Sequence, residues 1–421
     1  MSQRQLLAHV IVMLPFVVLT PQASGEDGPK PVLDPSVGDG GVSTFYVWDK
    51  TVPGVPGKLL RQEPLASELM LVNASKGLRV LYTSTDGLDN KTPIAVSGAI
   101  YFPKSAAPAS GWPVIAWAHG TTGIADTCAP SWLPRSSRDS DYLNAWLAQG
   151  YAIVATDYQG LGTPGGHPYL TVRPEAYSVL DSVRAALKSF PELSNSVVIV
   201  GQSQGAHAAV SASLLSTEYA PDVHLKGTVA TGVPGGTPPF GPVTKAPQIA
   251  VPPRVGGDFP ALNLLSLLAD HIINSSLNPS DYLADVARPA FEVARTACME
   301  DLRKAAKQGG LTVENEFNKS RDAAGLKTAP FKQYPSRGFE HPVFIGTGLA
   351  DMSVFPESQY NLVIATCYAG SSVEAHYYPG KDHSGTLNTS LVDSVPFVRK
   401  AFADQSIAGN CSSVQPPPSR N

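Results

Sequence analysis

One serine between two glycines, in GQSQG at residues 201–205, is the clearest candidate for chemistry in this chain. It follows the apolar run SVVIV (196–200) and precedes AHAAVSASLL (206–215), so a predicted strand gives way to a predicted helix at this point. Such a turn lifts the serine hydroxyl clear of a sheet, and glycines tolerate the crowding because they lack Cβ. We therefore predict that Ser203 is a nucleophile.

A base that accepts the serine proton is expected late in the chain, because turns of this kind are followed by an acid and then a histidine. His383, in YYPGKDHSGT (377–386), follows the last predicted strand and precedes the last predicted helix. Catalytic loops gather at this edge of a parallel sheet, so His383 is the predicted base. The other histidines considered are predicted to be structural: His207, His224, His271, His341 and His376.

The acid that orients the base is predicted to be Asp351. It closes the strand PVFIGTGLAD (342–351) and opens the loop before the next helix. Asp382 is the alternative, but a side chain next to His383 in sequence is poorly placed to accept from that ring while both point into one site. Asp157, at the end of an earlier strand, is interpreted as a residue that structures its loop.

Donors for a developing oxyanion are expected at two places. The backbone N–H of Gln204 begins the helix that follows Ser203 and comes first. The second donor is predicted in the loop AWAHGTTGIADTCAPS (116–131), with the N–H of Thr121 preferred and Gly120 next.

The sequence offers no motif for a cofactor, a metal or a nucleic acid. The glycine-rich run DYQGLGTPGGHPY (157–169) lacks the spacing of a phosphate-binding loop and is interpreted as a rigid rim of the site. The cysteines and histidines lack metal-type spacing. A net charge of −4 without a basic run gives no electrostatic reason to bind nucleic acid.

Alternating strands and helices predict an α/β fold with a mostly parallel, doubly wound sheet. The first strands have no helix between them and should form an antiparallel edge. The predicted strands are 78–85, 94–102, 113–120, 151–158, 197–203, 227–234, 342–351 and 373–379. The predicted helices between and after them are 139–150, 174–190, 205–215, 357–370 and 391–402.

The alternation breaks between two sheet strands, and this divides the predicted domain. Residues 237–338 contain the apolar stretch 259–277 and a helical stretch over 281–307, so they are predicted to form an inserted helical cap or lid, with a second independent domain as the alternative. The core is then 59–236 together with 339–411. Residues 26–58 are predicted to be an irregular arm and 412–421 a flexible tail.

The N-terminus has the pattern of an export signal. Arg4 precedes an apolar run over 6–19, and small residues precede an expected cut between Gly25 and Glu26. We therefore expect a signal peptide over 1–25 and a protein exported to a periplasm or to the medium. Export favours two disulfides among Cys128, Cys298, Cys367 and Cys411, and the spacing leaves all three pairings open.

Several of these segments resemble the secretory lipase family, and they occur in the family's order from about residue 55 to 411. The matching segments are VPGKLLRQEPL (55–65), HGTTG and CAPS within 119–131, DYQGLGTPGGHPYL (157–170), SVLDSVRAA (178–186), GQSQG (201–205) and GLADMSVFP (348–356). The resemblance implies an α/β-hydrolase fold with a helical cap, a triad of Ser203, Asp351 and His383, and ester hydrolysis without a cofactor. It also implies the disulfides Cys128–Cys298 and Cys367–Cys411.

The sequence therefore predicts a secreted serine ester hydrolase, a lipase or esterase, that cleaves hydrophobic acyl esters through an acyl-enzyme. The expected partners are a small-molecule or lipid ester and a transient lipid interface. The apolar stretch 259–273 either lines an acyl pocket or packs onto the core. The rival hypotheses are an acyltransferase or peptidase with the same triad, and a non-catalytic binding protein on the same scaffold.

Overall fold

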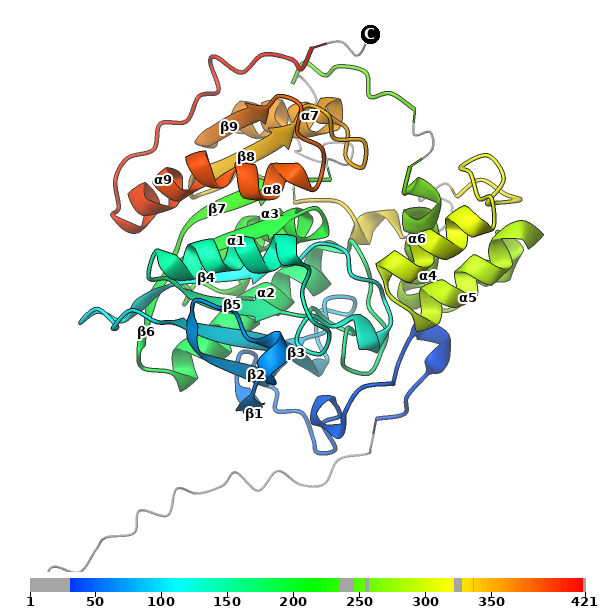
Figure 1. The fold of residues 1–421 in the computed structure, drawn as a ribbon, viewed down its shortest axis with the longest axis horizontal. Helices are drawn as coiled ribbons and strands as arrows, with labels where there is room; N and C mark the ends of the chain where they lie inside the picture. Colours follow the sequence, from blue (N-terminus) through cyan, green and yellow to red (C-terminus); the bar gives the residue numbers. More distant parts are fainter. Residues whose placement is uncertain (1–30, 235–245, 254–256, 322–327, 336, 419–421) are drawn as a thin grey trace, which may run out of the picture.

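The computed structural model describes residues 31–234, 246–253, 257–321, 328–335 and 337–418. Its centre is a nine-stranded sheet with the order β1-β2-β3-β5-β4-β6-β7-β8-β9 (Figure 1). The strands are β1 (Leu59–Pro64), β2 (Ala74–Thr85), β3 (Pro93–Pro103), β4 (Trp112–Ala118), β5 (Ala152–Thr156), β6 (Leu193–Gln202), β7 (Leu225–Thr231), β8 (Val343–Gly348) and β9 (Val373–Tyr378).

The sheet is antiparallel at one edge and parallel elsewhere, as the sequence predicts. β1, β2, β3 and β5 pair antiparallel in that order, whereas every pair from β5–β4 through β8–β9 is parallel. Eight of the nine strands match predicted segments. β1 is the strand that the sequence analysis missed.

Helices cover both faces of the sheet, which explains why the central strands are continuously apolar. Val197 and Ile199 of β6 pack in one core with α2, α3 and α7, while Val198 and Val200 pack in another with α1, α8 and α9. These helices are α1 (Ser137–Ala148), α2 (Val172–Ser189), α3 (Gln204–Tyr219), α7 (Pro356–Tyr368), α8 (Gly385–Thr389) and α9 (Leu391–Phe402).

Among the described residues between β7 and β8, three further α-helices form a separate hydrophobic core beside the sheet (Figure 1). They are α4 (Phe259–Ile273), α5 (Arg288–Thr296) and α6 (Met299–Gln308). The predicted helical stretch over 281–307 is therefore broken into two helices. Pro289 stands in the first turn of α5, and Cys298 has an extended backbone (φ −91°, ψ 171°) that separates α5 from α6.

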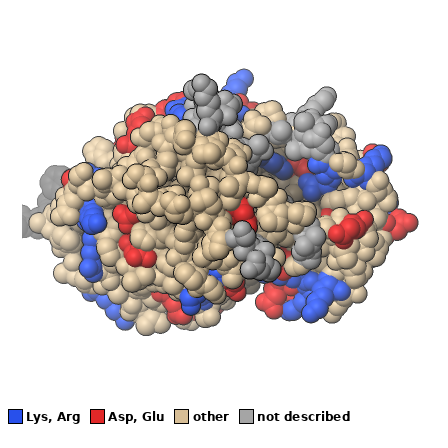
Figure 2. Space-filling model, turned by 90° about the horizontal axis from the view of Figure 1, so that it is seen from above, with Lys and Arg blue, Asp and Glu red and all other residues tan. Residues whose placement is uncertain are grey.

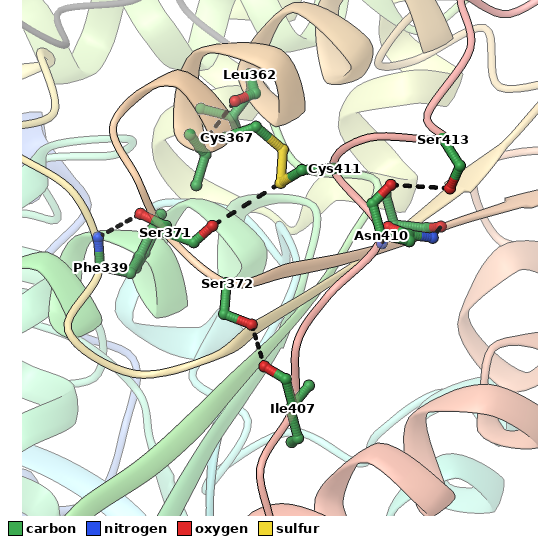
Figure 3. The surroundings of a disulfide bond; sticks show 11 residues. Phe339, Leu362, Cys367, Ser371, Ser372, Ile407, Asn410, Cys411 and Ser413 are labelled. Atoms are coloured by element: carbon green, nitrogen blue, oxygen red, sulfur yellow. Dashed lines mark hydrogen bonds between the residues drawn. A yellow bond between two sulfur atoms is a disulfide. The ribbon is translucent and has the colours of Figure 1, made fainter.

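The four cysteines form two disulfides, with the pairing that the resemblance implies. Cys128–Cys298 joins the loop after β4 to the start of α6. Cys367–Cys411 joins α7 to the C-terminal segment (Figure 3). Next to it, the side chain of Asn410 donates to the carbonyl of Ala375 and accepts from the N–H of the same residue, so this segment is fixed along the edge strand β9.

The described part of the N-terminal arm, residues 31–58, packs against the rest of the molecule. It contains 3-10 turns at Pro35–Val37 and Thr44–Tyr46, and Phe45 and Tyr46 are buried. The predicted signal peptide falls on residues 1–25, outside the described residues. Within the described residues, every helix is too short or too polar to span a bilayer.

Candidate active site

The turn between β6 and α3 holds Ser203 in a backbone conformation that is rare for a residue with a side chain. Its φ is +57° and its ψ is −122°. A Cβ on Gly201 would lie 1.9 Å from the carbonyl oxygen of Gly205, and a Cβ on Gly205 would lie 1.9 Å from that of Ala118. The two glycines are thus sterically required, and the turn has the form of a nucleophile elbow.

The predicted acid and base are in contact. Asp351 follows β8 and is fully buried, and its Oδ2 lies 2.7 Å from Nδ1 of His383 in the loop after β9. The other carboxylate oxygen accepts the backbone N–H groups of Ser353 and Val354, at 2.9 and 2.8 Å. A proton on Nδ1 is donated to the carboxylate, so Nε2 is the ring nitrogen that can accept a proton.

Asp382, the alternative acid, has a different role in the structure. Its carboxylate accepts the backbone N–H of Gly385 at 2.7 Å, at the start of α8. This contact fixes the Asp382 carboxylate to the turn that leads into α8. Asp157 structures its loop, as interpreted from the sequence: it is fully buried and accepts from Ser97 and from the backbone and hydroxyl of Ser131.

Gln359 supports the acid and was missed by the sequence analysis. Its side-chain nitrogen lies 3.2 Å from Oδ2 of Asp351, and its side-chain oxygen accepts the hydroxyl of Thr347 at 3.0 Å. The second contact fixes which end of the amide faces the carboxylate. Gln359 lies on α7, eight positions after the acid, and no motif connects the two.

A cavity of about 860 Å³ brings the predicted residues together. Its lining includes Ser203, His383, Gly120 and Thr121. Within the described residues, no hydrogen bond joins the Ser203 hydroxyl to the His383 ring. Such bonds are often long in unliganded hydrolases and shorten when substrate binds.

The predicted oxyanion donors flank the serine. Gln204 is the first residue of α3, and Gly120 and Thr121 directly follow His119 at the end of β4. A Cβ on Gly120 would lie 2.8 Å from the Gln202 side-chain oxygen, so this loop approaches the elbow closely. The N–H of Ser203 itself bonds to the carbonyl of Thr231 and is therefore already occupied.

Two side chains in this loop have roles that the structure now defines. The hydroxyl of Thr121 lies 2.8 Å from the hydroxyl of Tyr169, so it is engaged with a neighbouring loop. His119 is fully buried, and burial lowers its pKa to about 3. The His119 ring is therefore neutral at physiological pH and has a single N–H to donate. Its Nδ1 lies 2.7 Å from the carbonyl oxygen of Gly120, the shorter of its two contacts with backbone carbonyls, and this hydrogen bond holds the turn.

The apolar helix α4 contributes both to a hydrophobic core and to the lining of the cavity. Its leucines 264, 265, 267 and 268 are buried in the core formed with α5 and α6. Phe259, Leu262, Asn263 and Ser266 face the cavity instead. The cavity wall on this side is therefore half apolar and half polar, and most of the helix serves packing. Within the described residues, no cluster of three metal-ligating side chains is found.

Comparison with known proteins gives matches to lipases. The family model described as "Secretory lipase" matches residues 137–239, a segment that includes the elbow. Lipase 7 of Candida albicans is 38% identical over 94 residues, which is 21% of each chain. Lipase A of Moesziomyces aphidis is 26% identical over 191 residues, 42% of this chain and 39% of its own. The chain thus aligns with well under half the length of either relative.

Solved structures match over most of the chain. Candida antarctica lipase A has a TM-score of 0.66 at 21% identity and covers 86% of each chain. The rice cell wall degrading esterase LipA from Xanthomonas oryzae has a TM-score of 0.64 at 18% identity, with 83% of this chain and 99% of its own covered.

The chain resembles the secretory lipases. This confirms the resemblance inferred from its motifs, and the α/β-hydrolase fold is confirmed as well. The structural matches establish the fold alone, since their sequence identity is low. What the chain does with that fold depends on the site described above.

Proposed function

We propose that this protein is a serine carboxylic-ester hydrolase that acts through an acyl-enzyme on Ser203. The proposal depends above all on one observation. A nucleophile elbow with φ +57° at Ser203 opens into the same cavity as a histidine whose Nδ1 lies 2.7 Å from a buried carboxylate. Relatives that are named lipase or esterase support the same reaction class.

In the proposed mechanism, Nε2 of His383 accepts the hydroxyl proton as Oγ of Ser203 attacks the ester carbonyl carbon. The carbonyl oxygen becomes an oxyanion, stabilised by the backbone N–H groups of Gln204 and Thr121. Collapse breaks the bond to the alcohol oxygen, which takes the proton from His383. Water then attacks the acyl-enzyme carbonyl and gives a proton to Nε2 of His383. The acyl–Oγ bond breaks, the free acid leaves, and Ser203 takes the proton back, while Asp351 stays ionised and holds the imidazolium.

The cavity favours esters that carry both an apolar chain and polar groups close to it, because its lining offers both kinds of surface. Phe259, Leu262 and Met299 supply apolar surface, whereas Asn263 and Ser266 supply polar groups on the same wall. We propose hydrophobic acyl esters as the substrate class, with transient contact at a lipid surface. The face in Figure 2 is largely uncharged, with lysines, arginines and acids interspersed rather than gathered into one basic field.

The inserted segment and the export signal complete the proposal. We propose that residues 237–338 form a cap over the cavity, that 59–236 and 339–411 form the core, and that the signal peptide is removed after Gly25. Secretion fits the disulfides and the secretory lipase resemblance. Mass spectrometry of the protein exported by a bacterial host tests the cut, which should leave Glu26 as the first residue.

Covalent labelling tests the catalytic role directly. A p-nitrophenyl alkylphosphonate should label the purified protein at Ser203 with one equivalent, release one nitrophenol and abolish ester hydrolysis. Ser203→Ala should neither be labelled nor hydrolyse p-nitrophenyl esters. Labelling elsewhere, or full activity of the alanine variant, would refute the role of Ser203. A wild-type protein that is neither labelled nor able to hydrolyse esters would favour a binding protein.

Partition experiments separate the hydrolase from the other enzymes that the triad allows. With a p-nitrophenyl ester series from acetate to palmitate, we expect water to resolve the acyl-enzyme and free acid to form. If an added alcohol or amine captured most of the acyl group at millimolar concentration, the protein would be an acyltransferase. Faster cleavage of peptide amides than of esters would make it a peptidase.

A further inference from the structure

A cluster of polar side chains lies buried directly beneath the nucleophile elbow. It contains Gln204, His167, Glu175 and His207, whose exposed fractions are 1, 0, 0 and 4%. They come from the first residue of α3, the loop before α2, the fourth residue of α2 and the fourth residue of α3. The proposed catalytic steps use only the backbone N–H of Gln204, so the side chains of this cluster are left without a role.

The hydrogen-bond geometry fixes how Gln204 and His167 are oriented. Nδ1 of His167 lies 2.9 Å from the carbonyl oxygen of Gln159 and therefore carries the ring proton. Burial lowers the pKa of His167, so the ring is neutral and Nε2 is an acceptor. The side-chain nitrogen of Gln204 lies 2.7 Å from that Nε2 and 2.9 Å from Oε1 of Glu175, so both of its hydrogens are donated.

The carboxylate of Glu175 contacts two of the other three side chains of this cluster, Gln204 and His207. Oε1 accepts the backbone N–H of Leu170 at 3.1 Å as well as the Gln204 amide, and Oε2 lies 2.6 Å from Nδ1 of His207. A fully buried carboxylate is costly unless donors surround it, and these three contacts compensate for that cost. The donors come from the loop before α2, from the first residue of α3 and from the fourth residue of α3.

The same loop also reaches the other predicted oxyanion donor. The N–H of Tyr169 bonds to the carbonyl of His167 at 2.8 Å, and the hydroxyl of Tyr169 lies 2.8 Å from the hydroxyl of Thr121. Residues 167–170 therefore contact Gln204 on one side and Thr121 on the other. One short segment spans both halves of the proposed oxyanion hole.

We propose that His167 and Glu175 are positioning residues that set the spacing between the two oxyanion donors. They hold the side chain of Gln204 and the segment 167–170, and thereby fix the backbone N–H groups of Gln204 and Thr121 relative to each other. The inference rests on the proposed hydrolase function. Electrostatic stabilisation by such donors depends on their being correctly placed before the reaction, so a small displacement costs rate rather than binding.

Substitution of His167 tests the proposal, because glutamine can still accept a hydrogen bond from Gln204 at this position and leucine cannot. In His167→Gln, the side-chain oxygen can take the place of Nε2 and accept from Gln204, whereas His167→Leu removes the acceptor. Tyr219→Phe is the matched control. It removes a partly buried hydrogen bond of 2.6 Å to Asp181, which also joins α3 to α2 but lies at the end of α3 and in the middle of α2.

The measurements are kcat per phosphonate-titrated site, KM, and the Ki of a trifluoromethyl ketone that mimics the tetrahedral intermediate. For His167→Leu we expect kcat to fall about 10- to 100-fold and Ki to rise by a similar factor, with KM within about twofold. In His167→Gln, kcat and Ki should both return close to their wild-type values. In Tyr219→Phe, kcat per titrated site and Ki should equal those of the wild type. Gln204→Met, which keeps the backbone donor but loses the side-chain anchor, should resemble His167→Leu.

A structural role without positioning would give a different pattern. The melting temperature and the titratable fraction would fall, but kcat and Ki per active site would stay as in the wild type, and this would overturn the proposal. Equal losses in His167→Gln and His167→Leu would overturn it too. If His167→Leu did not fold, Gln204→Met would decide the question. Wild-type hydrolysis is measured separately, so failure of the proposed function would be recognised independently.

Discussion

At the scale of single residues, the structure separates two aspartates that the sequence places near the same histidine. The carboxylate of Asp351 contacts the His383 ring and is held by two backbone N–H groups and by Gln359. The carboxylate of Asp382 instead accepts from Gly385. Proximity in sequence is thus a poor guide here, because the carboxylate that contacts the ring belongs to the more distant aspartate.

Substitution of each aspartate by asparagine makes this difference measurable. Asp351→Asn should lower kcat/KM for a p-nitrophenyl ester by about 10⁴-fold, since the amide cannot stabilise the imidazolium and favours the wrong tautomer. Asp382→Asn should stay within about threefold of the wild type, because its side-chain oxygen can still accept from Gly385. The opposite ranking would make Asp382 the catalytic acid.

At the scale of elements, apolar periodicity predicted most of the sheet but could not predict how segments meet. Strands such as SVVIV are recognisable because both of their faces are buried. β1 (Leu59–Pro64) was missed because it is an edge strand with half-exposed polar residues. The break between α5 and α6 was missed because the helical period continues through Thr296 and Met299 while the backbone at Cys298 is extended.

The three proposed catalytic residues could be assigned to one sheet edge from the sequence because each follows a recognisable strand, but the side chains that contact them could not. Ser203, Asp351 and His383 stand at the ends of β6, β8 and β9, which parallel pairing brings to one edge. Gln359 and Glu175 act from helices, and their contacts with the site depend on three-dimensional packing. A polar residue within an otherwise buried helical turn is the only signal that the sequence carried for Glu175.

The two disulfides connect different pairs of elements, and their removal should change the free energy of unfolding and kcat by different amounts. Cys128–Cys298 closes a sequence separation of 170 residues and Cys367–Cys411 one of 44. In the chain-entropy estimate, these loops stabilise by about 5 and about 4 kcal/mol. The first also holds the loop after β4 against α6, where the N–H of Met299 bonds to the carbonyl of Thr122 at 2.8 Å.

We therefore expect Cys128→Ser/Cys298→Ser to lower the free energy of unfolding by about 1 kcal/mol more than Cys367→Ser/Cys411→Ser. The first pair should also lower kcat, because the loop that carries Thr121 loses a covalent anchor. The second pair should leave kcat per titrated site unchanged. Urea unfolding and ester hydrolysis below the transition measure both quantities, and equal effects on kcat would contradict the expectation.

At the scale of the whole molecule, the N-terminal arm is attached to the loop after β4 through a buried acid, Asp126. The N–H of Gly40 donates to Oδ2 of Asp126 at 2.7 Å, and the N–H of Asp126 donates to the carbonyl of Gly38 at 2.9 Å. Arg295 of α5 donates to the carbonyl of Ser36 at 3.0 Å. The arm thus connects the loop after β4 with the helices beside the sheet (Figure 1).

Asp126 gives this attachment a pH dependence. Burial, with Asp39 nearby, raises its pKa from 3.8 to about 7. Between these values the folded protein holds a proton that the unfolded chain has released. The stability that this group contributes is therefore complete below about pH 4 and is lost as the pH rises through about 7.

Asp126→Asn should remove this share of the pH dependence. Between pH 4.5 and 8, we expect the free energy of unfolding to fall by roughly 2–4 kcal/mol less in the variant than in the wild type. Glu316, whose pKa burial also raises to about 7, acts in the same direction in both proteins, so only the difference is diagnostic. Asp49→Asn, at an exposed position of the same arm, changes the net charge equally and should leave the wild-type slope. Parallel curves for Asp126→Asn and the wild type would show that Asp126 releases its proton at the same pH in the folded and unfolded chains. The attachment of the arm would then contribute no pH dependence through Asp126.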